Sequence, residues 1–484
     1  MKFFIDQHGC AKNQTDGELI AGFLMERGYE FTLNADEADF ILVNSCGFIQ
    51  SAKKESIDAV CNIKQAYPKA KLVLTGCLAE RYAGQLIDQM PELDGVFGNG
   101  DLSKIADFMD GIKKQRGVET FPQKGVCGGD RPLLFNFPGS AFVKITEGCS
   151  NHCSFCAIPL IRGELRSRKE AEILREIKKL VKDGVYEINL IGQDLAAYGT
   201  DTGTTLAELL KKITEIPGDF IVRPLYIHPD HFSDDIIEAI KAAPGRLLPY
   251  FDIPFQSGDD GIILAMNRTG SYKEYAALVK KIRRSLPKAV LRTTFLTGFP
   301  GESDEAAENT AQFLQTIKPD WSGCFPYSRE EDTPAYKMKN RVPVRTARAR
   351  AAHLEELQSA ITAESLNRYV GKELNVLVEE LVTAGQNSDG YDGVDGSDGS
   401  DSISGEASAN NEGLAIGRAW FQAPEVDGSV VIRYDLDDAA AVASLEPGSV
   451  VTVKILASTG VDLDSRFIKN YRKNSKKNER KFIF

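Results

Sequence analysis

The chain has 484 residues, more than one ordinary hydrophobic core accommodates, so two to four domains are expected. Apolar residues make up 42% and charged residues 26%, which is the balance of a folded, soluble protein. The formal net charge of −11 argues against a general nucleic-acid binder, because such proteins are usually basic.

The sequence also indicates the cellular compartment in which the protein is expected. No stretch approaches the roughly 20 consecutive apolar residues of a membrane span, and Asp6 interrupts the N-terminal run before a signal-peptide core could form. A cytoplasmic protein without membrane contact is therefore expected. Nine cysteines in that compartment should be reduced thiols, metal ligands or redox groups, not structural disulfides.

Residues 1–120 alternate short apolar runs with helical patterns, which predicts a parallel α/β domain. The expected strands are Lys2–Asp6, Asp39–Asn44 and Lys71–Thr75. The expected helices are Asp16–Arg27, a helix from about Ile49, and one near Glu80–Gln89. Residues 121–140 contain glycines and prolines without a clear period and are predicted to form a linker.

Residues 141–369 contain six strand–helix repeats, which predict an open or closed α/β barrel. The expected strands are Phe142–Thr146, Glu187–Ile191, Ile221–Tyr226, Tyr250–Ile253, Val290–Leu296 and Gly323–Tyr327. The expected helices include Glu170–Lys182, Leu206–Ile216, Ser233–Ala243, Tyr272–Ser285 and Ser303–Ile317. A long helix over Thr346–Arg368 is predicted to close this domain.

Residues 370–465 change to a β pattern, which predicts a small antiparallel β-barrel. The expected strands are Glu373–Glu380, Leu414–Phe421, Val430–Tyr434 and Val450–Leu456. Residues 384–412 contain almost no bulky apolar side chain and are predicted to be a disordered insert. Residues 466–484 are expected to be a basic tail.

Three cysteines form a C-x3-C-x2-C motif just after the first expected barrel strand: Cys149, Cys153 and Cys156. Thiolates are the usual protein ligands of iron–sulfur clusters, and three ligands leave one iron of a [4Fe–4S] cube open. A zinc site is the alternative, with His152 as a possible fourth ligand, but structural zinc usually takes four closed ligands. Three free thiols at this spacing by chance are improbable.

A second set of cysteines, Cys10, Cys46 and Cys77, follows three different predicted strands. The carboxyl ends of strands in a parallel sheet converge on one crevice, so these thiols are expected to meet and hold a second cluster. Each is adjacent to a glycine, which favours this interpretation over three separate buried cysteines. No such pattern surrounds Cys61, Cys127 and Cys324, which are assigned structural or incidental roles.

The segment from Ile145 to Cys156, followed by Ile158-Pro159, Arg162-Gly163 and Arg166-Ser167-Arg168, resembles the radical S-adenosylmethionine enzymes, and within them the methylthiotransferases. The resemblance covers nearly the whole chain and implies a three-cysteine domain, a partial (βα)6 barrel and a TRAM β-barrel. It implies a [4Fe–4S] cluster on the C-x3-C-x2-C motif that binds S-adenosylmethionine, and a second [4Fe–4S] cluster, for sulfur donation, on the other three cysteines. A second S-adenosylmethionine would supply the methyl group.

The resemblance also implies cofactor contacts at two strand ends. Gly192, Gln193 and Asp194 follow the second barrel strand, where the family contacts the cofactor's amino group. Gly298 and Glu302 follow a later strand, on the face where barrel active sites form. A plain turn with a helix-capping Glu302 is the alternative, as is a solvated charged stretch for residues 162–168. No catalytic residue is assigned beyond the cluster ligands.

Two branches of the family differ in substrate. Several segments, among them Gly9–Asn13 and Tyr226–Phe232, resemble the RimO branch, which methylthiolates the β-carbon of an aspartate in ribosomal protein S-twelve. The alternatives are a transfer-RNA adenosine 2-methylthiotransferase and a non-catalytic iron–sulfur protein. Residues 372–464 carry 18 acids against 4 bases, which favours a basic protein partner over a phosphate backbone. A monomer with an external electron donor and sulfur source, acting on this basic ribosomal protein, is expected.

Overall fold

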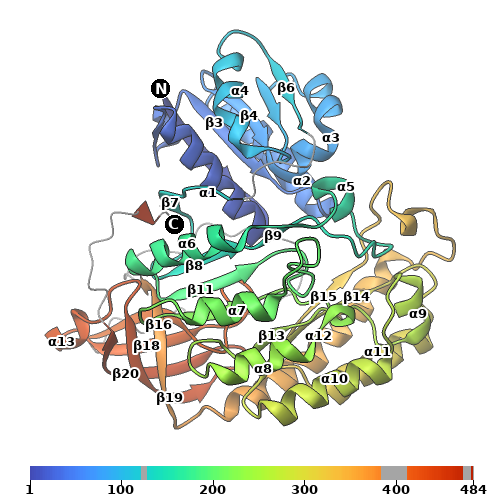
Figure 1. Ribbon diagram of the computed structural model, residues 1–484, viewed down its shortest axis with the longest axis vertical. Helices are drawn as coiled ribbons and strands as arrows, with labels where there is room; N and C mark the ends of the chain where they lie inside the picture. Colours follow the sequence, from blue (N-terminus) through green and yellow to red (C-terminus); the bar gives the residue numbers. More distant parts are fainter. Residues whose placement is uncertain (122–127, 383–410, 473–480, 483–484) are drawn as a thin grey trace.

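The computed structural model describes residues 1–121, 128–382, 411–472 and 481–482. Figure 1 shows three parts: an N-terminal sheet domain at the top, a central strand–helix barrel, and a C-terminal β-barrel at the lower left. The predicted α/β class with a terminal small barrel is confirmed. Among the described residues, no helix combines the length and apolar character needed to cross a bilayer.

The N-terminal domain is a parallel sheet with strand order β2-β1-β3-β4-β5-β6. Its strands are β1 (Lys2–Gln7), β2 (Glu30–Phe31), β3 (Phe40–Ser45), β4 (Lys71–Thr75), β5 (Gly95–Phe97) and β6 (Gly117–Glu119). Its helices are α1 (Ala11–Glu26), α2 (Gln50–Ala66), α3 (Gly76–Gln89) and α4 (Ile105–Ile112). Both α1 and α3 begin earlier than the sequence predicts, so each helix starts beside a strand end and beside a cysteine.

The central domain contains two parallel three-stranded sheets, β12-β11-β8 and β13-β14-β15. The strands are β8 (Ser140–Lys144), β11 (Glu187–Ile191), β12 (Ile221–Pro224), β13 (Tyr250–Asp252), β14 (Val290–Thr297) and β15 (Trp321–Pro326). A backbone hydrogen bond of 2.8 Å from Ile227 N–H to the Asp252 carbonyl joins the sheets, and β8 and β15 do not pair in the described chain. All six predicted strands are therefore present, as an open barrel.

Helices cover the outside of this barrel and bury its largest apolar core (Figure 1). They are α6 (Glu170–Lys182), α7 (Leu206–Thr214), α8 (Asp234–Ala242), α9 (Asp260–Ala265), α10 (Tyr272–Ser285), α11 (Asp304–Ile317) and α12 (Val344–Asn367). The short helix α5 (Ile158–Arg162) instead faces α3 of the N-terminal domain (Figure 1). Two short pairs complete the domain: β9 (Thr146–Glu147) with β10 (Arg166–Ser167), and β7 (Leu133–Leu134) with β21 (Lys481–Phe482). Within the expected linker, Arg131 is buried and pairs with Glu18 and Glu176.

The C-terminal domain is a closed barrel with strand order β16-β17-β18-β20-β19. Its elements are β16 (Glu373–Val382), β17 (Glu412–Ala419), β18 (Val430–Asp435), α13 (Ala439–Val442), β19 (Val450–Ser458) and β20 (Leu463–Arg472). The β18–β20 pairing is parallel, where the sequence predicts an antiparallel barrel. An odd number of strands cannot alternate in direction around a closed ring, so one parallel pair is required.

The sequence places the start of a basic tail at residue 466, but β20 continues to Arg472 and pairs with β19. Basic residues fit this strand because alternate side chains face solvent, where Arg466 meets Glu412 at 3.0 Å. The rest of the expected tail and residues 384–410 of the expected insert lie outside the described residues, and Asn411 and Glu412 lead into β17. Cys127 also lies outside them.

A buried charge network attaches the C-terminal barrel to the central one. Arg418 of β17 approaches Glu187 of β11 at 2.7 Å and Glu379 of β16 at 2.5 Å, and Arg223 of β12 approaches Glu187 at 2.6 Å. Burial disfavours the Glu187 carboxylate, but the two arginines outweigh it and hold its pKa below the usual range. The network satisfies charges that would otherwise be isolated between the two domains.

Replacing Arg418 with alanine should leave Glu379 without its arginine and Glu187 with one arginine in place of two. Removal of one partner from a buried ion pair typically costs about 3 kcal/mol or more, and a loss of this size in the free energy of unfolding is expected in urea. Arg433→Ala is the control, because Arg433 pairs with Glu412 and Asp464 near the surface and should cost at most about 1 kcal/mol. Equal losses in the two variants would contradict this account.

Candidate functional site

The C-x3-C-x2-C cysteines lie in the loop between β9 and α5, at the carboxyl end of the barrel strands. Cys153 is buried and the other two are half-buried. The loop is tied down by a 2.9 Å bond from Cys149 N–H to the Gly163 carbonyl and a 3.0 Å bond from Cys156 N–H to the Cys153 carbonyl. Burial and the neighbouring thiols raise the pKa of Cys156 to about 12. A bound metal would therefore be needed to hold this thiol as thiolate at neutral pH.

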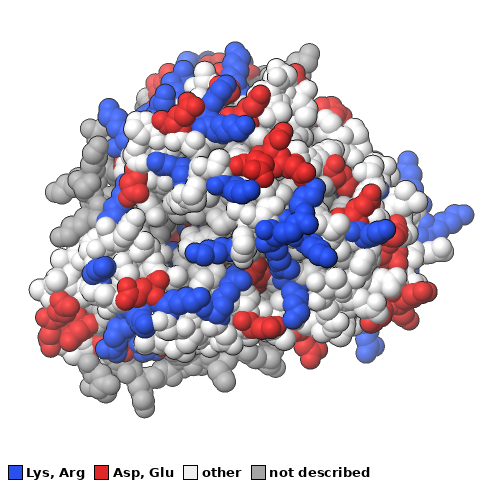
Figure 2. Space-filling model, turned by 60° about the horizontal axis from the view of Figure 1, so that its bottom comes forward, with Lys and Arg blue, Asp and Glu red and all other residues white. Residues whose placement is uncertain are grey.

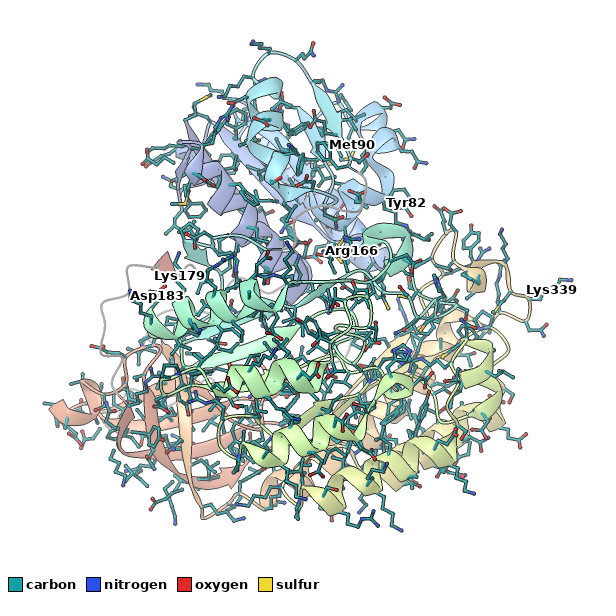
Figure 3. The ribbon with its side chains drawn as sticks, viewed as in Figure 1. Tyr82, Met90, Arg166, Lys179, Asp183 and Lys339 are labelled. Atoms are coloured by element: carbon teal, nitrogen blue, oxygen red, sulfur yellow. The ribbon has the colours of Figure 1, made fainter. Side chains whose placement is uncertain are left out.

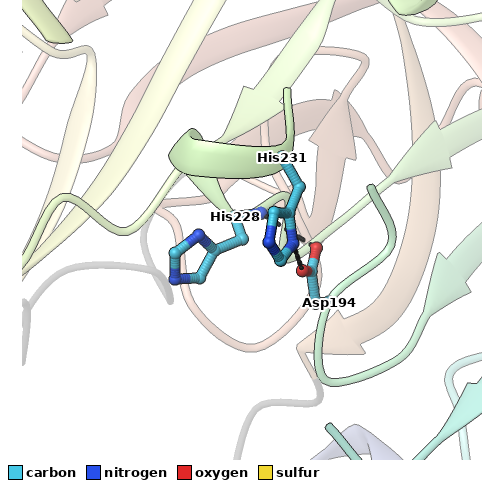
Figure 4. Close-up of side chains that lie close together, drawn as sticks. All are labelled: Asp194, His228 and His231. Carbon is cyan, nitrogen blue, oxygen red and sulfur yellow. Dashed lines mark hydrogen bonds and ion pairs between the residues drawn. The ribbon is translucent and has the colours of Figure 1, made fainter. Parts of the chain in front are cut away.

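Asp194 connects this loop to the ends of the barrel strands. Its carboxylate accepts hydrogen bonds from Asn151 Nδ2 at 3.0 Å, Ala196 N–H at 2.9 Å and His228 N–H at 3.2 Å, and it lies 2.7 Å from His231 Nδ1 (Figure 4). Burial opposes ionisation of Asp194, but the hydrogen bond to His231, the charge of His228 and the hydrogen bond from Asn151 lower the pKa of its carboxyl. Its oxygens therefore hold protein groups, and the expected contact with the cofactor stays a prediction.

His228 contacts the cysteine loop directly. Its Nε2 lies 3.8 Å from Cys153 Sγ, and its Nδ1 accepts the Asp230 N–H at 3.3 Å. His228 and His231 were not predicted as site residues, although the segment His228-Pro229-Asp230-His231 directly after a barrel strand gave a signal. Together with Asp194 they form a group whose ligand atoms all lie within 4.8 Å of one another.

The second cysteine set is brought together by adjacent parallel strands. Cys10 follows β1, Cys46 follows β3, and Cys77 lies in the first turn of α3 after β4. The loops pack so closely that a Cβ on Gly9 would lie 3.2 Å from Cys46 Cβ, and one on Gly47 would lie 2.7 Å from the Leu78 nitrogen. The glycines beside these cysteines therefore allow the three loops to converge.

The three thiols of this set differ electrostatically. Burial first, and then Cys77, raises the pKa of Cys46 to about 12. At Cys10 desolvation also disfavours the thiolate, but the charges of Lys12 and Arg162 and the backbone N–H groups at the start of α1 outweigh it, so its pKa is lowered. Start-of-helix N–H groups favour thiolates in this way, because they carry partial positive charge.

Arg162 links the two cysteine sets. It ends α5, which follows the first loop, and its Nη2 donates to Cys77 Sγ at 3.1 Å. Its Nη1 lies 2.8 Å from both Glu147 Oε1 and Asp16 Oδ2. The alternative of a solvated stretch is therefore wrong for Arg162, which is buried. Figure 3 places Arg166, in the same segment, where the N-terminal domain meets the barrel.

The remaining predicted contacts lie near this region but engage protein groups. Gln193 Nε2 approaches Glu147 Oε1 at 3.4 Å, and Gln193 Oε1 is buried with no hydrogen-bond partner among the described residues. Gly192 precedes it. Glu302 accepts the Gly298 N–H at 2.6 Å and pairs with Arg350 at 2.7 Å, so it closes the turn, whereas the helix cap expected from Glu302 in the alternative is supplied by Ser303. Binding of the cofactor by these residues stays a prediction.

The spacing of the sulfurs bears on which metal group fits. In the described chain only Asp194, His228 and His231 place three ligand atoms within 4.8 Å of one another, so neither cysteine set does. Ligands of one tetrahedral zinc ion with Zn–S near 2.3 Å would stand about 4 Å apart. Wider thiolate sets with a guanidinium beside one of them suit a polynuclear iron–sulfur cluster.

Comparison with known proteins identifies the family. Residues 2–98 match the uncharacterized protein family UPF0004, residues 143–314 the Radical SAM superfamily and residues 404–468 the TRAM domain. A ribosomal protein uS12 methylthiotransferase RimO of Treponema denticola is 49% identical over 95% of this chain and 99% of its own. The chain belongs to the RimO methylthiotransferase family. The RimO of Thermosipho africanus is 37% identical over 89% of this chain and 93% of its own.

Membership in the RimO family makes the chain a radical S-adenosylmethionine enzyme and implies one [4Fe–4S] cluster and S-adenosylmethionine as cofactors. The radical S-adenosylmethionine methyltransferase TsrM of Kitasatospora setae superposes with a TM-score of 0.52 at 13% identity, over 69% of this chain and 74% of its own, which shows a shared fold. The predicted family is thus confirmed.

Asp194→Ala should loosen the first cysteine loop, because Asn151 and the His228 backbone lose their common acceptor. Loss of groups that orient metal ligands typically weakens metal binding by about 10- to 100-fold. The variant should therefore release iron at a chelator concentration that is lower by about the same factor. Iron release is measured as the loss of visible absorbance of the cluster. The control is Asp201→Ala, since Asp201 is exposed and accepts only the Ser167 N–H nearby. Identical chelation curves would argue against a positioning role.

Proposed function

We propose that this chain methylthiolates the β-carbon of an aspartate in ribosomal protein uS12. The observation that carries the proposal is the near full-length likeness to relatives named uS12 methylthiotransferase, at 49% identity in one case. The central barrel with its cysteine loop and the second cysteine set above it supply the two metal-binding positions that this chemistry needs.

In this proposal Cys149, Cys153 and Cys156 hold the cluster that binds S-adenosylmethionine, and Cys10, Cys46 and Cys77 hold a second [4Fe–4S] cluster. When bound, these groups supply the 5′-deoxyadenosyl radical that removes hydrogen from the substrate carbon, the sulfur that takes its place and the methyl group. The protein positions the two cysteine sets relative to each other through Arg162. An electron donor and a sulfur source come from outside the chain, which acts as a monomer.

The surface of the C-terminal barrel supports a protein substrate over transfer RNA. Phosphate-binding surfaces need cations that are free to contact the backbone. Here Arg433 pairs with Glu412 at 3.0 Å and Asp464 at 2.7 Å, and Arg466 pairs with Glu412. Arg433 and Arg466 are thus neutralised within the barrel, and the 18 acids against 4 bases over residues 372–464 favour a basic protein partner. Figure 2 shows one face of the whole molecule, on which Lys and Arg side chains gather near the centre among scattered Asp and Glu.

The two cysteine sets should be separable by mutation. Cys153→Ala is expected to abolish reductive cleavage of S-adenosylmethionine, because the cluster that binds it loses a ligand. Cys46→Ala should retain cleavage and lose sulfur insertion. Cleavage is measured as 5′-deoxyadenosine and insertion by mass spectrometry of uS12. Cys61→Ala is the matched control, since Cys61 is exposed on α2. Full methylthiolation by Cys46→Ala would overturn the second cluster.

The substrate is tested in cells by deleting the gene and analysing ribosomal proteins and transfer-RNA nucleosides by mass spectrometry. Loss of a methylthio group from uS12, restored by the wild-type gene and not by the Cys153→Ala gene, is the expected result. Loss from transfer RNA alone would overturn the proposal in favour of the RNA-modifying branch. Absence of 5′-deoxyadenosine from the reduced protein with intact clusters would instead support a non-catalytic iron–sulfur protein.

A further inference from the structure

Lys12 is a half-buried cation that forms no ion pair with a carboxylate among the described residues. It lies in the first turn of α1, two residues after Cys10, and its Nζ stands 3.3 Å from the centroid of the Tyr226 ring. Within the described chain, no carboxylate oxygen lies within the 4.0 Å of an ion pair and no acceptor receives a hydrogen bond from this ammonium. Its interactions there are the contact with the aromatic ring and the effect of its charge on Cys10, whose pKa it lowers.

Other sheltered cations of the molecule are compensated. Lys144 contacts Asp16 and Glu147, Arg162 contacts the same two carboxylates, and Arg268 donates to backbone carbonyls. A ring face attracts an ammonium but accepts no conventional hydrogen bonds, so the three N–H donors of Lys12 stay largely unused. These donors are therefore open to a ligand that brings an acceptor, because the Lys12 side chain is only half-buried.

Lys12 stands between the elements that carry the two cysteine sets. On one side it is two residues from Cys10. On the other, Tyr226 is two residues before His228, whose Nε2 lies 3.8 Å from Cys153 Sγ. In the proposed function, the set that contains Cys153 serves hydrogen removal and the set that contains Cys10 serves sulfur donation. The substrate carbon therefore has to lie between the two cysteine sets.

The carboxylate of Asp252, which is near Lys12, already has other partners. Asp252 accepts the Tyr226 N–H at 3.1 Å through Oδ2, and its Oδ1 lies 3.5 Å from Arg292. Tyr226 holds a left-handed backbone at φ 63°, which is unusual for an aromatic residue and is fixed here by that bond. The Lys12 ammonium is also absent from the fully buried polar atoms that lack partners, so it keeps contact with solvent. A ligand can therefore reach it.

We propose that Lys12 binds the side-chain carboxylate of the substrate aspartate, an inference that rests on the proposed function. The carboxylate carbon of aspartate is bonded directly to the β-carbon, so an ammonium that fixes the carboxylate also fixes the hydrogen atom to be removed. A charge-assisted contact of this kind orients the substrate as well as binding it. An adenine ring offers no anion beside its reacting carbon, so Lys12 selects an acidic side chain over a neutral base.

The test measures discrimination between aspartate and asparagine. The aspartate that the wild-type enzyme modifies is located by mass spectrometry and replaced by asparagine in recombinant uS12. Binding of both forms to the reconstituted full-length protein is then measured for wild type, Lys12→Met and Lys12→Gln. Wild type should bind the aspartate form roughly 10- to 100-fold more tightly than the asparagine form, as expected for loss of a charged hydrogen bond. In both variants this ratio should fall to near one.

Iron content and substrate-free cleavage of S-adenosylmethionine are measured for every variant, and the binding ratios are compared at equal iron content, because the charge of Lys12 also acts on Cys10. Lys54→Met, at an exposed position of α2, is the matched control and should keep the wild-type ratio. Should Lys12→Met lose iron, the ratio in Lys12→Gln decides, because glutamine keeps hydrogen bonding without the charge. A wild-type ratio in Lys12→Gln overturns the inference.

The experiments distinguish failure of the proposed function from failure of the inference about Lys12. A wild-type protein that cleaves S-adenosylmethionine but leaves uS12 unmodified overturns the proposed function, and the role of Lys12 with it. A wild-type protein that modifies uS12, beside a Lys12→Gln variant with unchanged substrate discrimination, overturns the role of Lys12 alone.

Discussion

One buried carboxylate holds the two halves of the site in register. Asp16 of α1 contacts Lys144 of β8 and Arg162 of α5, and all three side chains are almost fully buried. Ion pairs of this kind add little net stability, because desolvation of the charges offsets their attraction, but an unpaired member is costly. The N-terminal domain is therefore held at one position on the barrel, where these charges meet, and both cysteine sets are placed by that contact.

The C-terminal barrel is attached to the central barrel by buried charges and hydrogen bonds as well. Arg418 enters from the C-terminal barrel and meets Glu187, while Trp321 Nε1 donates to the Phe421 carbonyl at 2.9 Å and the Tyr250 hydroxyl to Asp427 at 2.6 Å. Burial raises the pKa of Asp427 to about 6, and that hydroxyl and Arg292 oppose the shift. The open barrel thus carries buried polar groups at both ends, and each flanking domain pairs with them through its own charges.

The sequence was informative where the signal is local. Alternating strands and helices located the barrel, and the C-x3-C-x2-C spacing and the glycines beside Cys10, Cys46 and Cys77 pointed to the two cysteine sets. Partners distant along the chain could not be predicted, such as Arg162 with Cys77 or Arg418 with Glu187, because no pattern of residue types encodes them. Strand β20 was missed for a related reason: its basic residues are neutralised only once Glu412 and Asp464 lie beside it.

The contact at Asp16 also decides which partner has to adapt during binding. Swinging the N-terminal domain away from the barrel would separate Asp16 from Lys144 and Arg162, and those two cations would be left to share Glu147. The two cysteine sets are therefore expected to keep their separation when a substrate binds, so that the conformational adjustment falls to the segment of the substrate that carries the modified residue.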